Sequence, residues 1–234
     1  MMVINPNVSA IAALIGDPSR LAMLMSLLGG KALPASDLAH AARVSPQTAS
    51  AHLAKLVEGG LLAQEKYGRH KYFCLAAPEV AQALESLLAI APPKPVRSLR
   101  ESDELQHLRQ ARTCYDHLAG KVGVAFTDRL LELGYLEVSG QDYVLSLQGE
   151  AKLRSWGMDT ESDPKKRRHY ARQCLDWSER RYHLAGSLGA ALTRRMFELQ
   201  WIERRPNGRA IRVTDEGLQG LHTEFGLSAS AFSN

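Results

Sequence analysis

The sequence predicts a mainly α-helical protein with short β-hairpins, an α+β fold divided into two domains. Apolar residues recur at helical spacing through the first 90 residues. Prolines cluster at residues 92–95, where a helix cannot continue. A 21-residue segment of the second half occurs twice. These observations place one helical domain before the prolines and a repeated unit after them.

The composition is typical of a globular protein and limits its functions. The 234 residues suffice for two hydrophobic cores, and 29 Lys and Arg against 25 acidic residues give a net charge of +4. Nucleic-acid binding would therefore depend on local clusters of positive charge. No apolar run reaches the roughly 18–20 residues that span a bilayer, and no leader pattern opens the chain. We expect a cytoplasmic protein without a membrane partner.

Five helices and one hairpin are expected in the first 90 residues. Asp17 and Pro18 form a common helix start, an N-cap followed by proline at the first helical position. Gly68 marks the turn between two strand-like segments. The expected helices cover residues 8–15, 18–28, 35–42, 46–58 and 79–90, and the expected strands cover 61–66 and 71–75.

The fourth helix combines start and stop signals with a polar face. Ser45 is its expected N-cap, Pro46 opens it, and Gly59-Gly60 ends it with a left-handed turn. Three apolar residues share the face expected to point into the core: Ala49, Leu53 and Leu56. The opposite face is polar and slightly basic. Such a helix beside a basic hairpin is typical of winged helix-turn-helix domains, which bind duplex DNA.

The prolines at 92–95 favour an extended linker, and we place the domain boundary there. Residues 1–91 are expected to form a winged helix-turn-helix domain for DNA binding and dimerisation. Residues 92–96 form the linker, and residues 97–234 form a helical C-terminal domain.

The C-terminal domain contains an internal repeat. Residues 117–137 and 183–203 are identical at eleven of 21 positions, and an Arg-x-Cys-x-Asp sequence precedes each segment. The two copies extend over about residues 112–153 and 172–221. Each is expected to form two helices followed by a two-stranded wing. The domain is therefore predicted to consist of two tandem winged-helix-like repeats.

Several short motifs occur together in the first 90 residues. They are Asp17-Pro-x-Arg20, Thr48-x-Ser50-x-His52-Leu53-x-x-Leu56, Gly60-Leu61-Leu62 and Gly68-Arg69-x-x-Tyr72. In this combination the segment resembles the ArsR/SmtB family of bacterial transcriptional repressors. The resemblance implies a homodimeric repressor that places one helix of each protomer in a major groove of a pseudo-palindromic operator. The C-terminal extension is hardly covered by it.

The residues expected to contact double-stranded DNA lie on the fourth helix and on the hairpin. Gln, Ser and Thr side chains recognise base edges, whereas Lys and Arg favour phosphates. The helix supplies Ser45, Gln47, Thr48, Ser50, His52 and Lys55, and the wing supplies Lys66, Arg69, His70 and Lys71. The alternative for each is a solvated side chain of an amphipathic element. His52 is also open to an internal packing role.

The signal is left open between a metal ion, thiol oxidation and a small organic ligand. The cysteines that the family resemblance implies at the start of the third helix are absent. The remaining candidates for a metal or thiol sensor are Cys114, Asp116, His117, Cys174, Asp176 and His183. The helical spacing expected around both cysteines instead favours small buried apolar side chains. No motif requires a cofactor.

Three further features have two interpretations each. The repeated glycines either permit close helix packing, which we favour, or line a ligand pocket; they are Gly120, Gly123, Gly186 and Gly189. The basic run 165–168 either lies in solvent, as we favour, or contacts phosphate. The arginines of the last repeat are solvated or form a second DNA contact; they are Arg194, Arg195, Arg204, Arg205, Arg209 and Arg212.

The leading functional prediction is a homodimeric repressor released by a signal that the C-terminal domain senses. One alternative is a constitutive or architectural DNA binder that uses wings of both halves. Another is a protein-interaction module. We expect no enzyme, because the chain lacks a P-loop, a dinucleotide fingerprint, a nucleophile elbow and a His-Glu-x-x-His motif.

Overall fold

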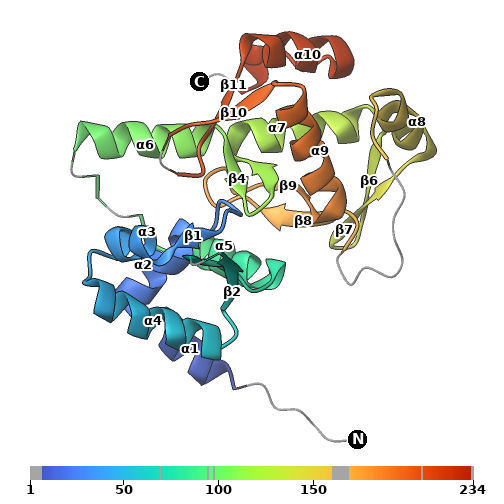
Figure 1. Ribbon diagram of the computed structural model, residues 1–234. Coiled ribbons are helices and arrows are strands. Elements are labelled where there is room, and N and C mark those ends of the chain that lie inside the picture. The colour runs from blue at the N-terminus through green and yellow to red at the C-terminus, as the bar shows by residue number, and fades with distance from the viewer. Residues whose placement is uncertain are drawn as a thin grey trace, which may run out of the picture. The chain divides into compact units, whose positions relative to one another are not determined.

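A computed structural model describes residues 7–68, 70–93, 95–96, 98–159, 169–206 and 208–232 (Figure 1). The chain divides into two compact units, residues 1–84 and 85–234. The described residues of the expected linker lie outside helices and strands.

The first unit contains the helices that the sequence predicts. Their bounds are α1 (Val8–Ile15), α2 (Pro18–Ser26), α3 (Ala35–Ala42) and α4 (Pro46–Glu58), and α5 (Pro78–Ile90) crosses the division between the units. Asp17 caps α2, since its side chain accepts hydrogen bonds from the backbone N–H groups of Ser19 and Arg20. Helices α2, α3 and α4 pack against one another through buried apolar side chains.

None of the described helices is long and apolar enough to cross a membrane by itself. The pair α1 and α2 passes a test of length and composition only when the two are joined across a bend of 86°.

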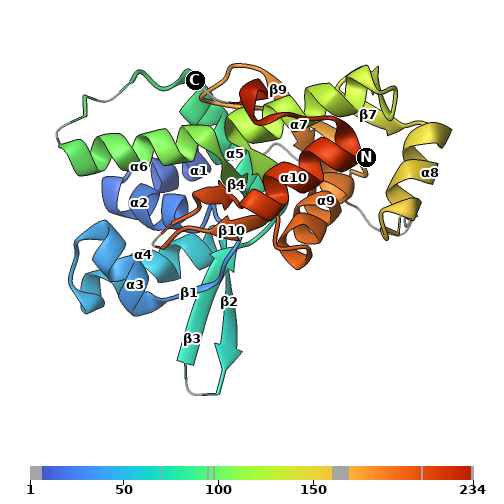
Figure 2. The ribbon, with the colours of Figure 1, turned by 90° about the horizontal axis from the view of Figure 1, so that it is seen from above.

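A three-stranded antiparallel sheet completes the first unit. It consists of β1 (Leu33–Pro34), β2 (Leu62–Tyr67) and β3 (His70–Leu75) in the order β1-β3-β2. The hairpin of β2 and β3 extends away from the helices of this unit (Figure 2). Strand β1 was not predicted, because a two-residue strand ending in proline carries no alternating pattern.

The second unit begins with α6 (Leu99–Gln110) and then contains both sequence copies. The first copy forms β4 (Arg112–Cys114), β5 (His117–Ala119), α7 (Gly120–Glu132), β6 (Leu136–Ser139), β7 (Asp142–Leu145) and α8 (Leu147–Ser155). The second forms β8 (Arg172–Leu175), β9 (Tyr182–Ala185), α9 (Gly186–Glu198), β10 (Ile202–Arg204), β11 (Ile211–Val213) and α10 (Asp215–Phe225). A short 3₁₀ helix covers Ala229–Ala231.

The predicted order of helix, helix and wing is wrong for the start of each copy. Each copy begins with a hairpin, continues with a helix and a second hairpin, and ends with a helix. The first hairpin turns within two residues, and Tyr115 in that turn has a left-handed φ of 60°. The segments of Cys114 and Cys174 are therefore strands, whose three or four residues are too few to distinguish helical from alternating periodicity.

The two copies exchange contacts reciprocally. Strand β8 pairs with β7 through Asp142 and Arg172, which joins the copies in one sheet of order β6-β7-β8-β9. Conversely, Arg112 of β4 in the first copy forms an isolated antiparallel β-bridge with Ala210 of the second copy, next to β11. Helix α7 packs on β9, and α9 packs on β5. One hydrophobic core is thereby shared between the copies, and Figure 1 shows α7 and α9 crossing beside the strands.

Candidate DNA-binding face and cysteine-histidine cluster

Helix α4 has one buried face and one exposed face, as the sequence predicts. Ser45 is its N-cap, Pro46 opens it, and Gly60 follows it with φ of 70°. The predicted core residues Ala49, Leu53 and Leu56 are all buried. Because these three hold α4 in place, the polar residues between them point away from the core.

The polar residues of α4 differ in how much hydrogen-bonding capacity they retain. The Ser45 hydroxyl accepts from the N–H of Thr48 at 3.2 Å and lies 2.9 Å from the Thr48 hydroxyl. The Ser50 hydroxyl donates to the carbonyl of Pro46 at 2.9 Å. Within the described part of the chain, Gln47 and Lys55 are exposed and have no hydrogen-bonding or ionic partner. These two side chains are fully available to a ligand.

His52 is half-buried, unlike its exposed neighbours on α4. The pKa of Asp17 is lowered chiefly by the hydrogen bond from the N–H of Arg20, and the nearby Arg20 and His52 side chains contribute. An internal role beside Asp17 therefore fits His52 at least as well as DNA contact.

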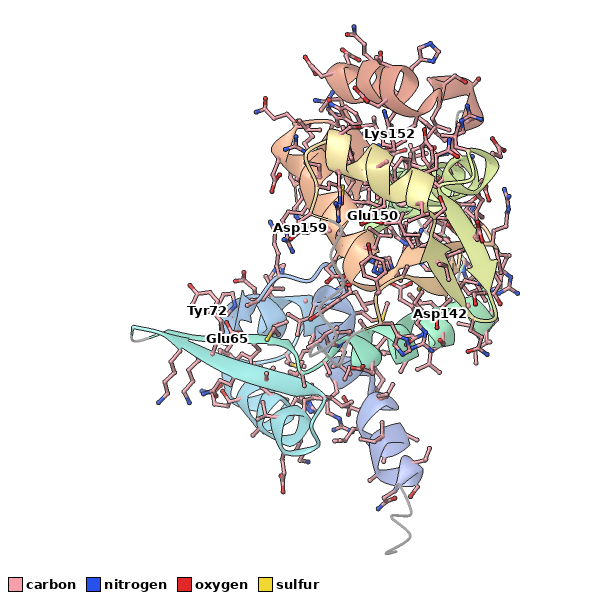
Figure 3. The ribbon with its side chains drawn as sticks, turned by 90° about the vertical axis from the view of Figure 1, so that its right-hand side faces the viewer. Glu65, Tyr72, Asp142, Glu150, Lys152 and Asp159 are labelled. Atoms are coloured by element: carbon pink, nitrogen blue, oxygen red, sulfur yellow. The ribbon has the colours of Figure 1, made fainter. Side chains whose placement is uncertain are left out.

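The hairpin of β2 and β3 carries a pair of like charges near its tip. Lys66 and Lys71 are direct cross-strand partners, and both are exposed. Like charges in this position repel each other. The adjacent pair, Glu65 and Tyr72, is labelled in Figure 3. Of the other predicted wing residues, Arg69 lies outside the described residues, and His70 begins β3.

Two hairpins of the second unit bring four predicted sensor residues together. Cys114 is the cross-strand partner of His117, and Cys174 is the cross-strand partner of His183. All four are buried, and their ligand atoms lie within 4.8 Å of one another. The two Sγ atoms are 3.9 Å apart, and the two Nε2 atoms are 3.1 Å apart.

The two aspartates of the repeated motif lie behind the histidines. Asp116 Oδ1 is 3.4 Å from His117 Nδ1, and Asp176 Oδ2 is 3.7 Å from His183 Nδ1. The cysteine-histidine cluster consists of the four converging residues Cys114, His117, Cys174 and His183. The other two candidate sensor residues, Asp116 and Asp176, lie next to its histidines.

Comparison with known proteins identifies the family. Residues 15–65 match the family model described as a helix-turn-helix domain. Over 213 residues the chain is 48% identical to YdfF of Bacillus subtilis strain 168, which is named an uncharacterised HTH-type transcriptional regulator. That alignment covers 91% of this chain and 94% of YdfF. The chain belongs to the helix-turn-helix transcriptional regulators.

The prediction that the first domain is the helix-turn-helix of a transcriptional regulator is thereby confirmed. Solved structures similar to this regulator include NolR from Sinorhizobium fredii, at 23% identity and a TM-score of 0.34, covering 38% of this chain and 96% of NolR. Reduced HlyU from Vibrio cholerae is 24% identical with a TM-score of 0.34, covering 37% of this chain and 90% of HlyU.

The cluster of this regulator has unusual electrostatics. The neighbouring Cys174 thiol and burial raise the pKa of Cys114. Burial alone lowers the pKa of His117, but the Cys114 sulfur and the Asp116 carboxylate outweigh it, so that pKa is raised. Burial alone raises the pKa of Asp176, but the Arg112 guanidinium prevails and that pKa is held well below its usual range.

The repeated glycines serve packing rather than a ligand pocket. A Cβ on Gly123 would lie 2.5 Å from the carbonyl oxygen of Leu118, and one on Gly189 would lie 2.4 Å from that of Leu184. The cavity lined by both glycines has a volume of only about 10 Å³, which is room for about one water molecule. The glycines therefore permit close packing, but the backbone that they approach belongs to β5 and β9 of their own copies rather than to another helix.

Several arginines of the last repeat already have partners inside this unit. Arg195 Nε donates to the carbonyl of Trp156, and Arg212 pairs with Glu203 at 2.8 Å. The Arg204 guanidinium lies over the Phe197 ring, 5.3 Å from its centroid. These contacts reduce the positive charge available for a second DNA contact. The basic run 165–168 lies outside the described residues.

One important residue, Arg112, was missed as a member of the site. It is completely buried, and its Nη2 lies 2.9 Å from Oδ1 of Asp176 in the other copy. Its Nη1 donates to the Leu108 carbonyl and to the Ser178 hydroxyl. The repeated Arg-x-Cys-x-Asp motif was the available signal, but the motif alone does not show that its Arg and Asp pair between copies.

Proposed function

We propose that this regulator is a sequence-specific DNA-binding repressor that acts as a homodimer. In each protomer α4 enters a major groove, and the β2–β3 wing contacts phosphates or the adjacent minor groove. Two symmetry-related α4 helices require a pseudo-palindromic operator. A signal sensed by residues 97–234 releases the protein from DNA by favouring a conformation with weaker operator affinity.

One observation carries this proposal: the exposed polar face of α4 lies in the same small domain as the lysine pair of the wing. Gln47 offers the amide that recognises adenine through two hydrogen bonds, and Lys55 offers a charge for phosphate. Lys66 and Lys71 repel each other in the free protein. A bound phosphate would relieve that repulsion, so the wing is better suited to DNA than to solvent alone.

Genome-wide footprinting of the full-length protein, followed by binding titrations on the recovered duplexes, tests this function. We expect two inverted half-sites separated by about one helical turn, roughly 10 base pairs. Light scattering is expected to give the mass of a dimer. Sites without inverted symmetry together with a monomeric mass would contradict the homodimer, and the absence of any specific site would contradict the repressor.

Replacing Gln47 with alanine is expected to reduce discrimination at one base pair of each half-site by about 1–3 kcal/mol, because a side chain that contacts a base edge is removed. Affinity for nonspecific duplex should stay unchanged, since phosphate contacts are kept. Fluorescence anisotropy with single-base-pair operator variants measures both quantities.

The matched control is Gln106→Ala, which removes an exposed glutamine from α6. The control should bind every operator variant like the wild type. Equal losses of the Gln47 variant on all sequences would show that Gln47 does not recognise a base.

A further inference from the structure

We infer that Cys114, His117, Cys174 and His183 bind one tetrahedral zinc ion, which joins the two copies of the repeat. The inference concerns the second unit only and holds whether or not α4 binds DNA. It assigns a metal site to residues for which the sequence spacing favoured a buried structural role and left the signal open.

The backbone register places the four residues as two matched pairs. Cys114 and His117 close the two-residue turn between β4 and β5, so that their side chains leave the hairpin on one face. Cys174 and His183 occupy the corresponding pairing in β8 and β9. Because each hairpin offers one thiol and one imidazole to the other, a closed four-ligand site arises where the copies meet.

The distances fit a single ion. A tetrahedral zinc ion with bonds of about 2.3 Å to sulfur and about 2.0–2.1 Å to nitrogen separates two sulfurs by about 3.8 Å and two nitrogens by about 3.3–3.4 Å. The observed separations are 3.9 Å between the sulfurs and 3.1 Å between the Nε2 atoms. A tetrahedral site also separates sulfur from nitrogen by about 3.5–3.6 Å. The four ligand atoms lie within 4.8 Å of one another, so binding an ion would bring the thiols and imidazoles up to about 1.2 Å closer together.

The donor set selects the metal class. Two thiolates and two imidazoles favour zinc and similar soft or borderline ions over magnesium and calcium, which prefer oxygen ligands. The four residues are at most 7% exposed, so that no open position is left for water or substrate. A closed site with four protein ligands is typical of structural or regulatory zinc rather than of catalytic zinc.

The surroundings of the histidines also suit a metal. When both Nε2 atoms bind an ion, each Nδ1 carries the proton, and Asp116 and Asp176 face these Nδ1 atoms at 3.4 and 3.7 Å. Carboxylates in this position orient ligand histidines and raise their basicity. Among the described residues the Nδ1 atom of the buried His183 has no hydrogen-bonding partner, so a small shift of this ring on metal binding could bring Nδ1 within hydrogen-bonding distance of Asp176.

The full-length wild-type protein, purified under reducing conditions, tests the inference directly. Elemental analysis is expected to find one zinc per chain. After exchange, Co²⁺ should give the ligand-field bands of a tetrahedral site and a sulfur-to-metal charge-transfer band. Alkylation followed by mass spectrometry should modify the partly exposed Cys74 whether or not the metal is bound, and Cys114 and Cys174 only after a chelator removes the metal.

Cysteine variants provide the second arm. Cys114→Ser and Cys174→Ser are each expected to lose the stoichiometric metal and the charge-transfer band. Cys74→Ser is the matched control, because Cys74 lies on β3, outside the cluster, and should retain both. If either ligand variant fails to fold, the measurements on the wild type decide.

Three results would overturn the inference. The first is wild-type protein that neither retains zinc nor gives a tetrahedral Co²⁺ spectrum when its thiols are reduced. The second is reactivity of Cys114 and Cys174 that a chelator leaves unchanged. The third is a disulfide between these two cysteines in the protein as isolated, which needs the sulfurs to approach to about 2.05 Å.

Discussion

Replacement of Asp176 by alanine is expected to lower the free energy of unfolding of the second unit by about 3–5 kcal/mol. The Asp176 carboxylate and the Arg112 guanidinium are completely buried and form an ion pair. Removal of the carboxylate leaves the Arg112 charge without compensation inside the protein. It also removes the acceptor for the N–H of Gly120 at 2.7 Å, a contact between the copies.

Tryptophan fluorescence during chemical denaturation of the full-length chain isolates this effect. The three tryptophans of the chain, Trp156, Trp177 and Trp201, all belong to the second unit. The first unit therefore does not contribute to the signal. Unfolding is measured once with zinc and once with a chelator. The Asp176 variant should show the lower free energy of unfolding under both conditions, because its lost ion pair does not involve the metal.

The matched control is Asp116→Ala, at the corresponding position of the first copy. The Asp116 side chain is 30% exposed and faces His117 at 3.4 Å. A partly exposed charge contributes much less than a buried one, so we expect a change within about 1 kcal/mol. Equal losses for the two variants would show that burial of the Arg112–Asp176 pair does not determine stability.

The double replacement Lys66→Ala/Lys71→Ala is expected to reduce the salt dependence of DNA binding. Each phosphate contact contributes about 0.9 to the slope of log K against log salt, so that two lysines contribute about 1.8 for each wing on the DNA. A homodimer with both wings bound should lose about 3.6. Between 50 and 200 mM salt, a loss of 1.8 means that the variant's affinity falls about 12-fold less than that of the wild type.

Titrations at several salt concentrations measure the slope, and the size of its change reports how many wings bind. Arg100→Ala/Arg109→Ala is the matched control, because it removes two exposed positive charges from α6 instead. That control should keep the wild-type slope. An unchanged slope of the lysine variant would contradict phosphate contact by the wing, and equal losses in both variants would show a general effect of net charge.

Local signals in the sequence sufficed for the helices and the β2–β3 hairpin of the first unit, although they missed the two-residue strand β1. Asp17 and Ser45 cap α2 and α4 as expected, because a cap needs only the side chain and the next few backbone N–H groups. The buried face of α4 follows from apolar spacing within one helix. The polar residues on its other face were therefore also assigned correctly as exposed, except for the half-buried His52.

The second unit was predicted less well. The repeat itself was visible, but the segments of Cys114 and Cys174 were expected to be helical and are strands. Each of these strands pairs with the next strand of its own hairpin and also with a segment far away in the chain, Arg112 with Ala210 and Arg172 with Asp142. Local periodicity contains no information about such partners.

The sequence by itself determined the helix-turn-helix, the polar face of α4 and the existence of two related copies. These features depend on caps, apolar spacing and identity between segments, all of which are local or read along the chain. Only the tertiary structure decided that Cys114, His117, Cys174 and His183 form one cluster and that Arg112 pairs with Asp176. The physical reason is that both arrangements depend on strand register and on reciprocal packing between copies about 60 residues apart.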